Sequence, residues 1–308
     1  MNMTNKNLHI ISFTIPMIGI CTYYLLFSSY VSNSSITSTF KNQNILVTGA
    51  SQGIGKEIVL DLVGRGANVL LVSRNLQKLQ DVKRQALLSH PTSTSTIHIL
   101  SKDLSTETAA DETVAFAEGV FGGKLDTLIL NHITNSRVGT WLGDHADSQG
   151  FLLPMFHTNF FSYVWLATKS MDMLERSSGR IGVVSSLAGF VGTPKTSVYS
   201  ATKHALMGFF DAFRIELKML GKDNVSVTIA SIGATDTEGA REYAMNEMSS
   251  KISWDPADRA ARAILEGLTT RKRNIFHPHH LVFPSVLINA HAPSVLDYVL
   301  RKTIEISN

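Results

Sequence analysis

Residues 48–55 read Thr48-Gly49-Ala50-Ser51-Gln52-Gly53-Ile54-Gly55, directly after an apolar run at 44–48 and before a segment of helical spacing at 56–63. Glycines permit a tight turn and bring backbone N–H groups close to an anion at the start of a helix, where the helix dipole favours negative charge. Three glycines near a turn are a weak signal alone, but the strand–turn–helix context strengthens it. The stretch therefore predicts a dinucleotide-binding loop with cofactor contacts at Gly49, Ala50, Ser51, Gln52, Gly53, Ile54 and Gly55.

Apolar runs of strand length alternate with segments of helical spacing along the rest of the chain. The runs lie at 44–48, 68–73, 97–101, 127–130, 181–185 and 225–231, and the helical segments at 56–63, 76–88, 109–121, 156–174 and 202–220. Strands that are apolar on both faces and separated by helices form a parallel sheet covered on both sides. The pattern predicts an α/β fold with a doubly wound parallel sheet of the Rossmann type, as a single domain over 41–277.

The end of the second predicted strand indicates which dinucleotide binds. An acidic side chain there would accept a hydrogen bond from the ribose 2′-OH and would repel a 2′-phosphate. The chain instead has Ser73 and Arg74, whose hydroxyl and guanidinium groups can donate to phosphate. We therefore expect NADP(H) as the cofactor, bound in part by these two residues.

Ser186, Tyr199 and Lys203 have the composition of an acid–base site. Tyr199 and Lys203 have the i, i+4 spacing that places both on one face of a helix. An ammonium neighbour favours the phenolate of a tyrosine, whose ordinary pKa of ~10 makes it a poor base at neutral pH. Ser186 ends the fifth predicted strand, where ligands of open α/β sheets bind. The YxxxK spacing occurs by chance in many helices, but together with the serine and the phosphate loop it predicts a catalytic centre.

These motifs resemble the short-chain dehydrogenase/reductase family over about 41–277. The matching pieces are TGASQGIG, Asp103-Leu104, Asn131, Asn159, Ser186 and the YSATK motif at 199–203. Within the family the resemblance is closest to the 11β-hydroxysteroid dehydrogenase type 1 group. The stretches that carry it are Asn131-His132-Ile133-Thr134, VVSSLAG at 183–189 and Asp236-Thr237-Glu238.

The resemblance implies a role for each matching residue. It makes Tyr199 the proton donor or acceptor, while Lys203 lowers the pKa of Tyr199 and holds the nicotinamide ribose. It has Ser186 orient the substrate oxygen and Asn159 position a proton-relay water. The further cofactor contacts that it implies are Asp103, Leu104, Asn131, His132, Ile133, Thr235, Asp236 and Thr237.

Two positions depart from those steroid enzymes. Gln52 stands where they carry a lysine, and Thr193 stands where they place a substrate-facing tyrosine. The resemblance still implies an NADP(H)-dependent oxidoreductase that interconverts a carbonyl and a secondary alcohol on a lipophilic, steroid-like substrate, with substrate contacts at Ser186, Tyr199 and Thr193. The alternatives are a retinoid or lipid-carbonyl reductase and a non-catalytic membrane or lipid-droplet protein of the same fold.

The N-terminal segment is a candidate membrane anchor. No Asp, Glu, Lys or Arg occurs between Lys6 and Lys41, and the stretch at 8–31 is mainly apolar. At ~1.5 Å per residue a helix of this length crosses a ~30 Å hydrocarbon core. A cleaved signal peptide and a buried core helix are the competing interpretations. We expect a short flank at 1–7, a transmembrane signal anchor at 8–31 and a polar linker at 32–40.

Charges beside this stretch predict its orientation. Lys6 and the terminal amine precede it, and no cation follows until Lys41, so the positive-inside rule keeps the N-terminus in the cytosol. Together with the resemblance, this predicts a single-pass protein of the endoplasmic reticulum membrane with a lumenal catalytic domain. Asn224-Val225-Ser226 is a glycosylation sequon in a polar turn, and Asn224 is therefore a candidate glycan site.

Composition excludes several classes of protein. The 308 residues include 28 Lys+Arg, 25 Asp+Glu and one cysteine. This balance disfavours a disordered chain, a disulfide scaffold and a nucleic-acid partner. The tail histidines have no HExxH or cysteine cluster beside them, so we expect no metal site.

The C-terminal part departs from the strand–helix alternation. Asp255-Pro256 is expected to open a helix at 257–268 with a side-chain cap. The extension at 278–308 is apolar and interrupted by prolines. A homodimer surface, a patch that lies on the bilayer and ordinary core packing are the three interpretations of this extension.

Overall fold

The computed structural model describes residues 40–134, 138–142, 149–243 and 253–304. Contacts divide the chain into a unit at Met1–Thr39 and a unit at Phe40–Asn308, and the second unit holds the fold. The predicted flank at 1–7 and anchor at 8–31 lie outside the described residues, as does the linker except for Phe40. Among the residues that are described, no helix combines the length and apolar character needed to cross a membrane.

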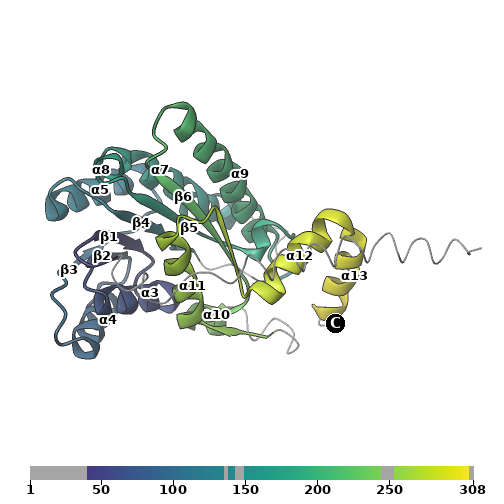
Figure 1. Ribbon diagram of the computed structural model, residues 1–308. Coiled ribbons are helices and arrows are strands. Elements are labelled where there is room, and N and C mark those ends of the chain that lie inside the picture. The colour runs from purple at the N-terminus through teal and green to yellow at the C-terminus, as the bar shows by residue number, and fades with distance from the viewer. Residues whose placement is uncertain (1–39, 135–137, 143–148, 244–252, 305–308) are drawn as a thin grey trace, which may run out of the picture. The chain divides into compact units, whose positions relative to one another are not determined.

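A parallel sheet of seven strands forms the centre of this unit (Figure 1). In sheet order the strands are β3 (Ile97–Ser101), β2 (Asn68–Ser73), β1 (Asn44–Thr48), β4 (Thr127–Leu130), β5 (Arg180–Ser186), β6 (Ser226–Ile232) and β9 (Asn274–His277). The order reverses between β1 and β4, and ligands of such sheets bind in the crevice at this point. The predicted doubly wound sheet is confirmed.

Alternating side chains of the strands make both faces of the sheet apolar. Ile45 and Val47 of β1 belong to one buried cluster, while Leu46 between them belongs to the other. Helices α3 (Gly53–Gly64), α4 (Leu76–Ser89) and α11 (Ala257–Thr269) cover the first face, and α5 (Glu107–Phe121), α7 (Ser162–Lys169) and α9 (Ser197–Met219) cover the second (Figure 1). Strands apolar on both faces therefore bury their side chains under helices on either side.

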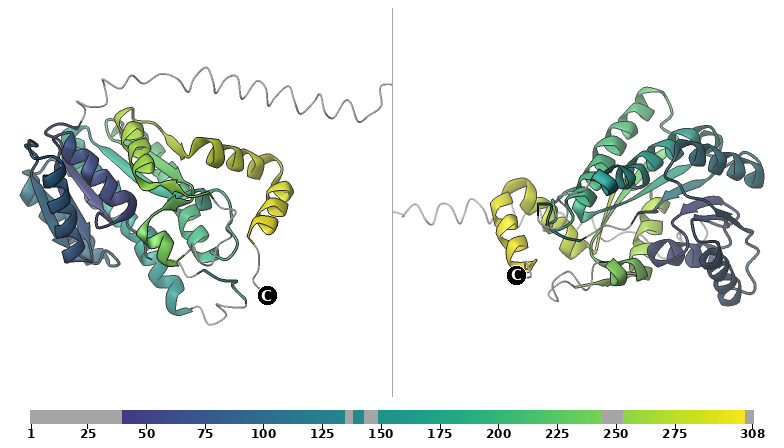
Figure 2. Two further views of the ribbon diagram at one scale, coloured as in Figure 1. Left: turned by 90° about the horizontal axis from the view of Figure 1, so that it is seen from below. Right: turned by 180° about the vertical axis from the view of Figure 1, so that it is seen from behind.

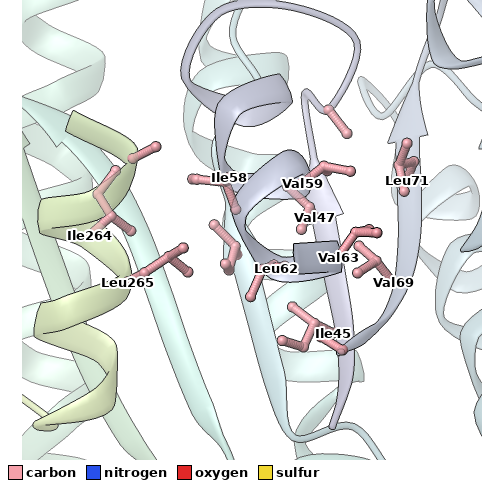
Figure 3. Packing of buried hydrophobic residues seen from close by; sticks show 14 of the residues in the cluster. Ile45, Val47, Ile58, Val59, Leu62, Val63, Val69, Leu71, Ile264 and Leu265 are labelled. Atoms are coloured by element: carbon pink, nitrogen blue, oxygen red, sulfur yellow. The ribbon is translucent and has the colours of Figure 1, made fainter. Parts of the chain in front are cut away.

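Helix α3 lies beside α11 on one face of the sheet (Figure 3). Its side chains Val59 and Val63 lie toward β1 and β2, and Ile58 lies toward Ile264 of α11. These four side chains are fully or almost fully buried. This packing holds the start of α3, and with it the glycine-rich loop, against the carboxyl end of β1.

One helix was expected at 156–174, but the chain forms several shorter elements there. They are α6 (Gln149–Phe156), a π-helix (His157–Phe161), α7 and α8 (Met171–Ser177). The wider π turn changes the direction of the side chains that follow it, and such turns are frequent at functional sites. Asn159, one of the predicted catalytic residues, lies in the middle of this π-helix.

Asp255 and Pro256 do not cap a helix, contrary to the sequence-based expectation. They form the short strand β8 (Asp255–Pro256), which pairs with β7 (Thr235–Asp236), and α11 begins at Ala257 without a side-chain cap. The Asp255 carboxylate instead accepts a hydrogen bond from Nε2 of His277, at 2.8 Å. The Asp255 carboxylate, which was expected to cap the helix, therefore binds His277 of β9 instead.

The chain ends in two helices, α12 (His279–His291) and α13 (Pro293–Thr303). Figure 2 shows them at one end of the unit, apart from the helices that cover the sheet. They bury Val282 and Leu296, whereas Val295 and Tyr298 remain 55% and 66% exposed. Core packing thus accounts for only part of their apolar surface, and a dimer contact and a bilayer contact both stay predictions.

Candidate active site

The glycine-rich loop between β1 and α3 has no room for a side chain at its glycine positions Gly49, Gly53 and Gly55. Gly49 and Gly53 have φ angles of +64° and +56°, a region that favours glycine. A Cβ on Gly55 would stand 2.2 Å from the carbonyl oxygen of Gly49. Helix α3 has neither a side-chain N-cap nor an acidic residue in its first turn. The backbone N–H of Gly53 at this helix start instead donates to the carboxylate of Glu238 at 2.9 Å, so the turn binds an anionic group, which a cofactor phosphate would replace.

A cavity of about 460 Å³ lies over this loop, within the usual range for small-molecule sites. The carboxyl ends of β1 to β4 and the starts of α3 and α4 meet around it. It collects most of the predicted cofactor contacts, namely Gly49, Ser51, Gln52, Gly53, Ile54, Ser73, Arg74, Asp103, Leu104, Asn131, His132, Ile133 and Thr237.

The end of the cavity beside β2 suits a phosphate group. Arg74 and Lys78 line it, and among the described residues neither forms an ion pair with a carboxylate. Lys102, by contrast, pairs with Glu112 at 2.7 Å. The buried hydroxyl of Ser73 has no hydrogen-bond partner within the described part of the chain. A hydroxyl without a partner beside two cations and a glycine cradle fits a dinucleotide that carries an additional phosphate.

Ser186, Tyr199 and Lys203 come together where β5 ends and α9 begins. Burial raises the pKa of Tyr199, and a hydrogen bond with Ser186 acts in the opposite direction. The ammonium nitrogen of Lys203 lies 5.6 Å from the centre of the Tyr199 ring and donates to the carbonyl oxygen of Val184 at 2.9 Å. Lys203 is 1% exposed, and burial lowers its pKa to about 7.

Asn159 has the geometry of a water-binding group. Its side chain is fully buried, and its Oδ1 accepts a hydrogen bond from the backbone N–H of Thr134 at 2.8 Å. Within the described residues, Nδ2 has no hydrogen-bond acceptor. A buried amide donor of this kind requires a partner such as an ordered water or a ligand, which agrees with the expected relay role.

His132 links the two parts of the site. Its ring nitrogens contact the hydroxyl oxygens of Thr48 at 2.8 Å and Ser162 at 2.7 Å. Burial, with the positive charges of Lys203 and Arg74, lowers the pKa of His132 to about 3, so the imidazole is neutral. A neutral imidazole bonded on both sides joins the end of β1 to α7 and holds the backbone that lines the cavity.

Comparison with known proteins identifies the family. The model of the short chain dehydrogenase family matches residues 43–247. The chain belongs to the short-chain dehydrogenase family. Hydroxysteroid 11-beta-dehydrogenase 1-like protein A of Xenopus laevis is 32% identical over 92% of this chain and 94% of its own length. The like-named protein of Gallus gallus is 39% identical over 76% of this chain and 78% of its own length.

Solved structures of the family share the fold. A short chain dehydrogenase from Burkholderia cenocepacia J2315, in complex with NADP, superposes with a TM-score of 0.69 over 85% of this chain and 98% of that one. One from Sphingobium yanoikuyae, in complex with NADPH, gives 0.66 over 86% and 97%. Both are 20% identical to this chain, so the likeness concerns the fold alone.

Some residues predicted for the site lie beside the cavity rather than on its wall. Ala50 and Gly55 are buried inside the glycine turn. The Thr235 hydroxyl donates to the carbonyl oxygen of Gly233, and Asp236 pairs with Arg241 at 2.7 Å. Ser186, Tyr199, Lys203 and Asn159 are likewise absent from the cavity lining and form the neighbouring acid–base cluster.

Thr193 occupies a structural position at the start of α9. Its hydroxyl contacts the hydroxyls of Thr196 at 2.6 Å and Ser200 at 2.9 Å, and its backbone N–H donates to Ser200. The side chain is thus bonded to its own helix terminus. Its substrate contact stays a prediction.

Three charged residues of the cavity wall were missed from the sequence, namely Lys78, Lys102 and Glu242. Lys78 lies in the first turn of α4, four residues after Arg74, and this closeness in sequence was the available signal. The Glu238 carboxylate accepts a hydrogen bond from the backbone N–H of Gly53 at 2.9 Å. No sequence pattern could reveal that bond, because the two residues meet only through the fold.

The pKa of Tyr199 also differs from expectation. Lys203 was expected to lower it, but in this structure burial raises it. A phenolate is poorly solvated in the interior, and Lys203 carries only about half of its charge at pH 7 because burial lowers its pKa to about 7. The hydrogen bond with Ser186 is the interaction that favours the phenolate here.

Lys203→Met is expected to change the pH dependence of stability. Burial lowers the folded-state pKa of Lys203 from 10.5 to about 7, so between these values the unfolded chain binds the additional proton. The free energy of unfolding of the wild type therefore rises with pH between about 7 and 10.5. Below pH 7 Lys203 is charged in both states, and the burial of its charge then destabilises the folded protein to the full extent. We expect Lys203→Met to exceed the wild type in free energy of unfolding at pH 7, and this gain should shrink by about 1 kcal/mol or more by pH 10.

Urea unfolding at pH 7, 8.5 and 10 measures this difference. Lys218→Met, which removes an exposed lysine from the same helix, is the control and should give a difference that does not vary with pH. A constant difference for Lys203→Met would show that Lys203 does not titrate in this range.

Proposed function

We propose that this protein is an NADP(H)-dependent oxidoreductase that interconverts a carbonyl and a secondary alcohol on a lipophilic, steroid-like substrate. The observation that carries the proposal is that Ser186, Tyr199 and Lys203 come together beside the cavity. The glycine loop lines this cavity, together with two cations, Arg74 and Lys78, that form no ion pair with a carboxylate among the described residues. The nicotinamide cofactor, when bound, supplies or accepts the hydride. The residues Gly49, Gly53, Asn131, Ser73 and Arg74 would hold it.

The protein's own residues move the proton. Burial keeps the phenol of Tyr199 protonated at neutral pH, and its hydroxyl can donate to a substrate carbonyl oxygen as a general acid. Ser186 holds the same oxygen through a hydrogen bond. Lys203, with a pKa of about 7, and a water bound at Nδ2 of Asn159 can return a proton to Tyr199. The protonated phenol is the form of Tyr199 that the reductive step requires.

Aromatic side chains next to Ser186 support a lipophilic substrate. Phe190 follows the catalytic serine by one turn, and its ring lies 5.8 Å from that of Phe276. Phe276 in turn lies 5.5 Å from Phe283 of α12. The two relatives named hydroxysteroid 11-beta-dehydrogenase 1-like support the steroid class. A turnover screen of steroid and retinoid carbonyls with NADPH tests the proposal, and absence of turnover on all of them by a protein that binds NADPH would contradict it.

Wild-type enzyme is expected to prefer NADPH over NADH by roughly 10–150-fold in kcat/KM, because one charge-assisted hydrogen bond contributes about 1.5–3 kcal/mol. Arg74→Asp should reverse this preference, since a carboxylate accepts from a free 2′-OH and repels phosphate. Steady-state kinetics with both cofactors measure it. Arg84→Asp makes the same charge change at a side chain 70% exposed on α4 and should leave the ratio unchanged. Equal use of the two cofactors by the wild type would refute the NADP(H) assignment.

We further propose that the apolar stretch at 8–31 anchors the protein in the endoplasmic reticulum membrane with its catalytic domain in the lumen. The absence of charge between Lys6 and Lys41 supports the anchor, and the cation on one flank supports the orientation. Asn224 is exposed in the turn before β6, and its side-chain nitrogen donates to the carbonyl oxygen of Glu175 at 3.1 Å.

Protease protection in sealed microsomes tests this topology. The catalytic domain should resist digestion until detergent is added, and Asn224→Gln should remove any shift in mobility that a glycosidase abolishes. Digestion of the domain without detergent would contradict the lumenal orientation.

A further inference from the structure

Position 52 of the phosphate loop is a neutral glutamine, and a lysine from another helix lies beside it. Nζ of Lys78 donates a hydrogen bond to Oε1 of Gln52 at 2.5 Å. Gln52 is the N-cap residue of α3, and Lys78 lies in the first turn of α4, where its backbone N–H donates to the side chain of the N-cap Asn75 at 2.9 Å. The ammonium group is therefore held between the starts of two helices.

The surroundings leave this ammonium available to an anion. Lys78 lines the cavity together with Ser73 and Arg74, and within the described residues no carboxylate pairs with it. The amide oxygen of Gln52 is a neutral acceptor, which directs the ammonium without cancelling its charge. A lysine ammonium has three donor hydrogens, so two remain for phosphate oxygens after the bond to Gln52.

Other cations near the cavity have different partners. Lys102 is neutralised by Glu112 at 2.7 Å. On α4 itself, Arg84 pairs with Asp81 at 2.6 Å, and Lys83 donates to the carbonyl oxygen of Ile97 at 2.8 Å. Among the described cations of α4, Lys78 is thus the one that faces the cavity without a carboxylate or a strand carbonyl as partner.

We propose that Lys78 is a specificity-determining residue that binds the 2′-phosphate of NADP(H) and replaces the cation missing at position 52. The inference rests on the proposed function, because it concerns the same cofactor. Gln52 acts as a positioning residue that holds the Lys78 ammonium over the cavity. Arg74, in the turn between β2 and α4, and Lys78, in the first turn of α4, then contact the phosphate together with the hydroxyl of Ser73 at the end of β2.

Binding measurements without substrate test the assignment. Dissociation constants of the full-length protein are measured by calorimetry for NADPH, NADH, adenosine 2′,5′-bisphosphate and adenosine 5′-monophosphate. Lys78→Met, which keeps most of the apolar stem, should weaken NADPH and the bisphosphate about tenfold, the factor that corresponds to ~1.4 kcal/mol. It should leave NADH and the monophosphate within about twofold of the wild type. Arg84→Gln, which also removes one charge from α4, should change none of the four constants.

A second variant places the cation back on the loop. Adding Gln52→Lys to Lys78→Met should restore most of the tenfold loss for NADPH and for adenosine 2′,5′-bisphosphate, because a lysine at position 52 reaches the same phosphate. Equal losses for NADPH and NADH in Lys78→Met would assign Lys78 to general binding or to folding and would overturn the proposal.

The wild-type constants separate this inference from the proposed function. A wild type that prefers NADPH, together with a Lys78→Met variant that keeps the full preference, would refute the role of Lys78 and leave the NADP(H) assignment intact. A wild type that binds NADPH no better than NADH would refute the cofactor assignment itself, and the role of Lys78 with it.

Discussion

Tyr199→Phe is expected to lower kcat by roughly 10²–10⁴-fold, the usual contribution of general acid–base catalysis. The substitution removes the hydroxyl that exchanges a proton with the substrate oxygen and leaves the glycine loop and the cavity unchanged. The dissociation constant for NADPH should therefore stay within about twofold of the wild-type value. Single-turnover and steady-state rates, measured beside NADPH titrations, separate the two effects.

Tyr298→Phe is the matched control for this experiment. Tyr298 is 66% exposed on α13, and loss of its hydroxyl should change neither turnover nor cofactor binding. Retention of more than about a tenth of wild-type activity by Tyr199→Phe would mean that another group transfers the proton. The catalytic assignment would then fail even if the family assignment stands.

Gly55→Ala is expected to destabilise the protein by about 2 kcal/mol or more and to weaken NADPH binding at least tenfold. The added Cβ would stand 2.2 Å from the carbonyl oxygen of Gly49 and 2.6 Å from Nδ2 of Asn131. Neither can yield cheaply, because Gly49 is in the turn backbone and the Asn131 amide donates to the carbonyl oxygens of Thr48 and Gly49. The turn must open, and the N–H groups that would face a pyrophosphate shift with it.

Gly208→Ala provides the contrast. Gly208 lies inside α9, and a Cβ there would meet no atom within 4 Å. Alanine is favoured over glycine in a helix interior by up to about 1 kcal/mol, so this variant should equal or exceed the wild type in stability. Chemical denaturation and NADPH titration of both variants make the comparison. Wild-type stability and binding in Gly55→Ala would show that the loop does not need glycine at this position.

Local sequence signals were sufficient for most of the sheet and for the parts of the site that lie on one segment. The strands from β1 to β6 are apolar runs between helices, and burial on both faces makes such runs recognisable. The short strand β9 was not predicted, because its four residues differ little from the apolar tail that follows. Its register is set by pairing with β6, which lies far away in the sequence.

The pKa values and local backbone of the site depended on the fold more than on local sequence. Sequence alone identified Tyr199 and Lys203 as a pair, but it could not give their pKa values, because these depend on how deeply the neighbouring elements bury them. The π-helix at Asn159 and the strand pairing of Asp255 were missed for a similar reason. In both cases contacts with distant segments determine the local backbone.

The sequence by itself indicated the family, the parallel sheet and the glycine loop, and it identified Ser186, Tyr199 and Lys203 as candidate acid–base residues, since these features are encoded in short patterns of residue spacing. The tertiary structure alone decided which further side chains join the predicted contacts at the cavity. Lys78 and Gln52 lie on separate helices, and Glu238 reaches Gly53 from the far end of the chain. Such pairs are invisible to local patterns, because the packing of α3 and α4 on one face of the sheet, and not their order in the chain, brings their first turns together.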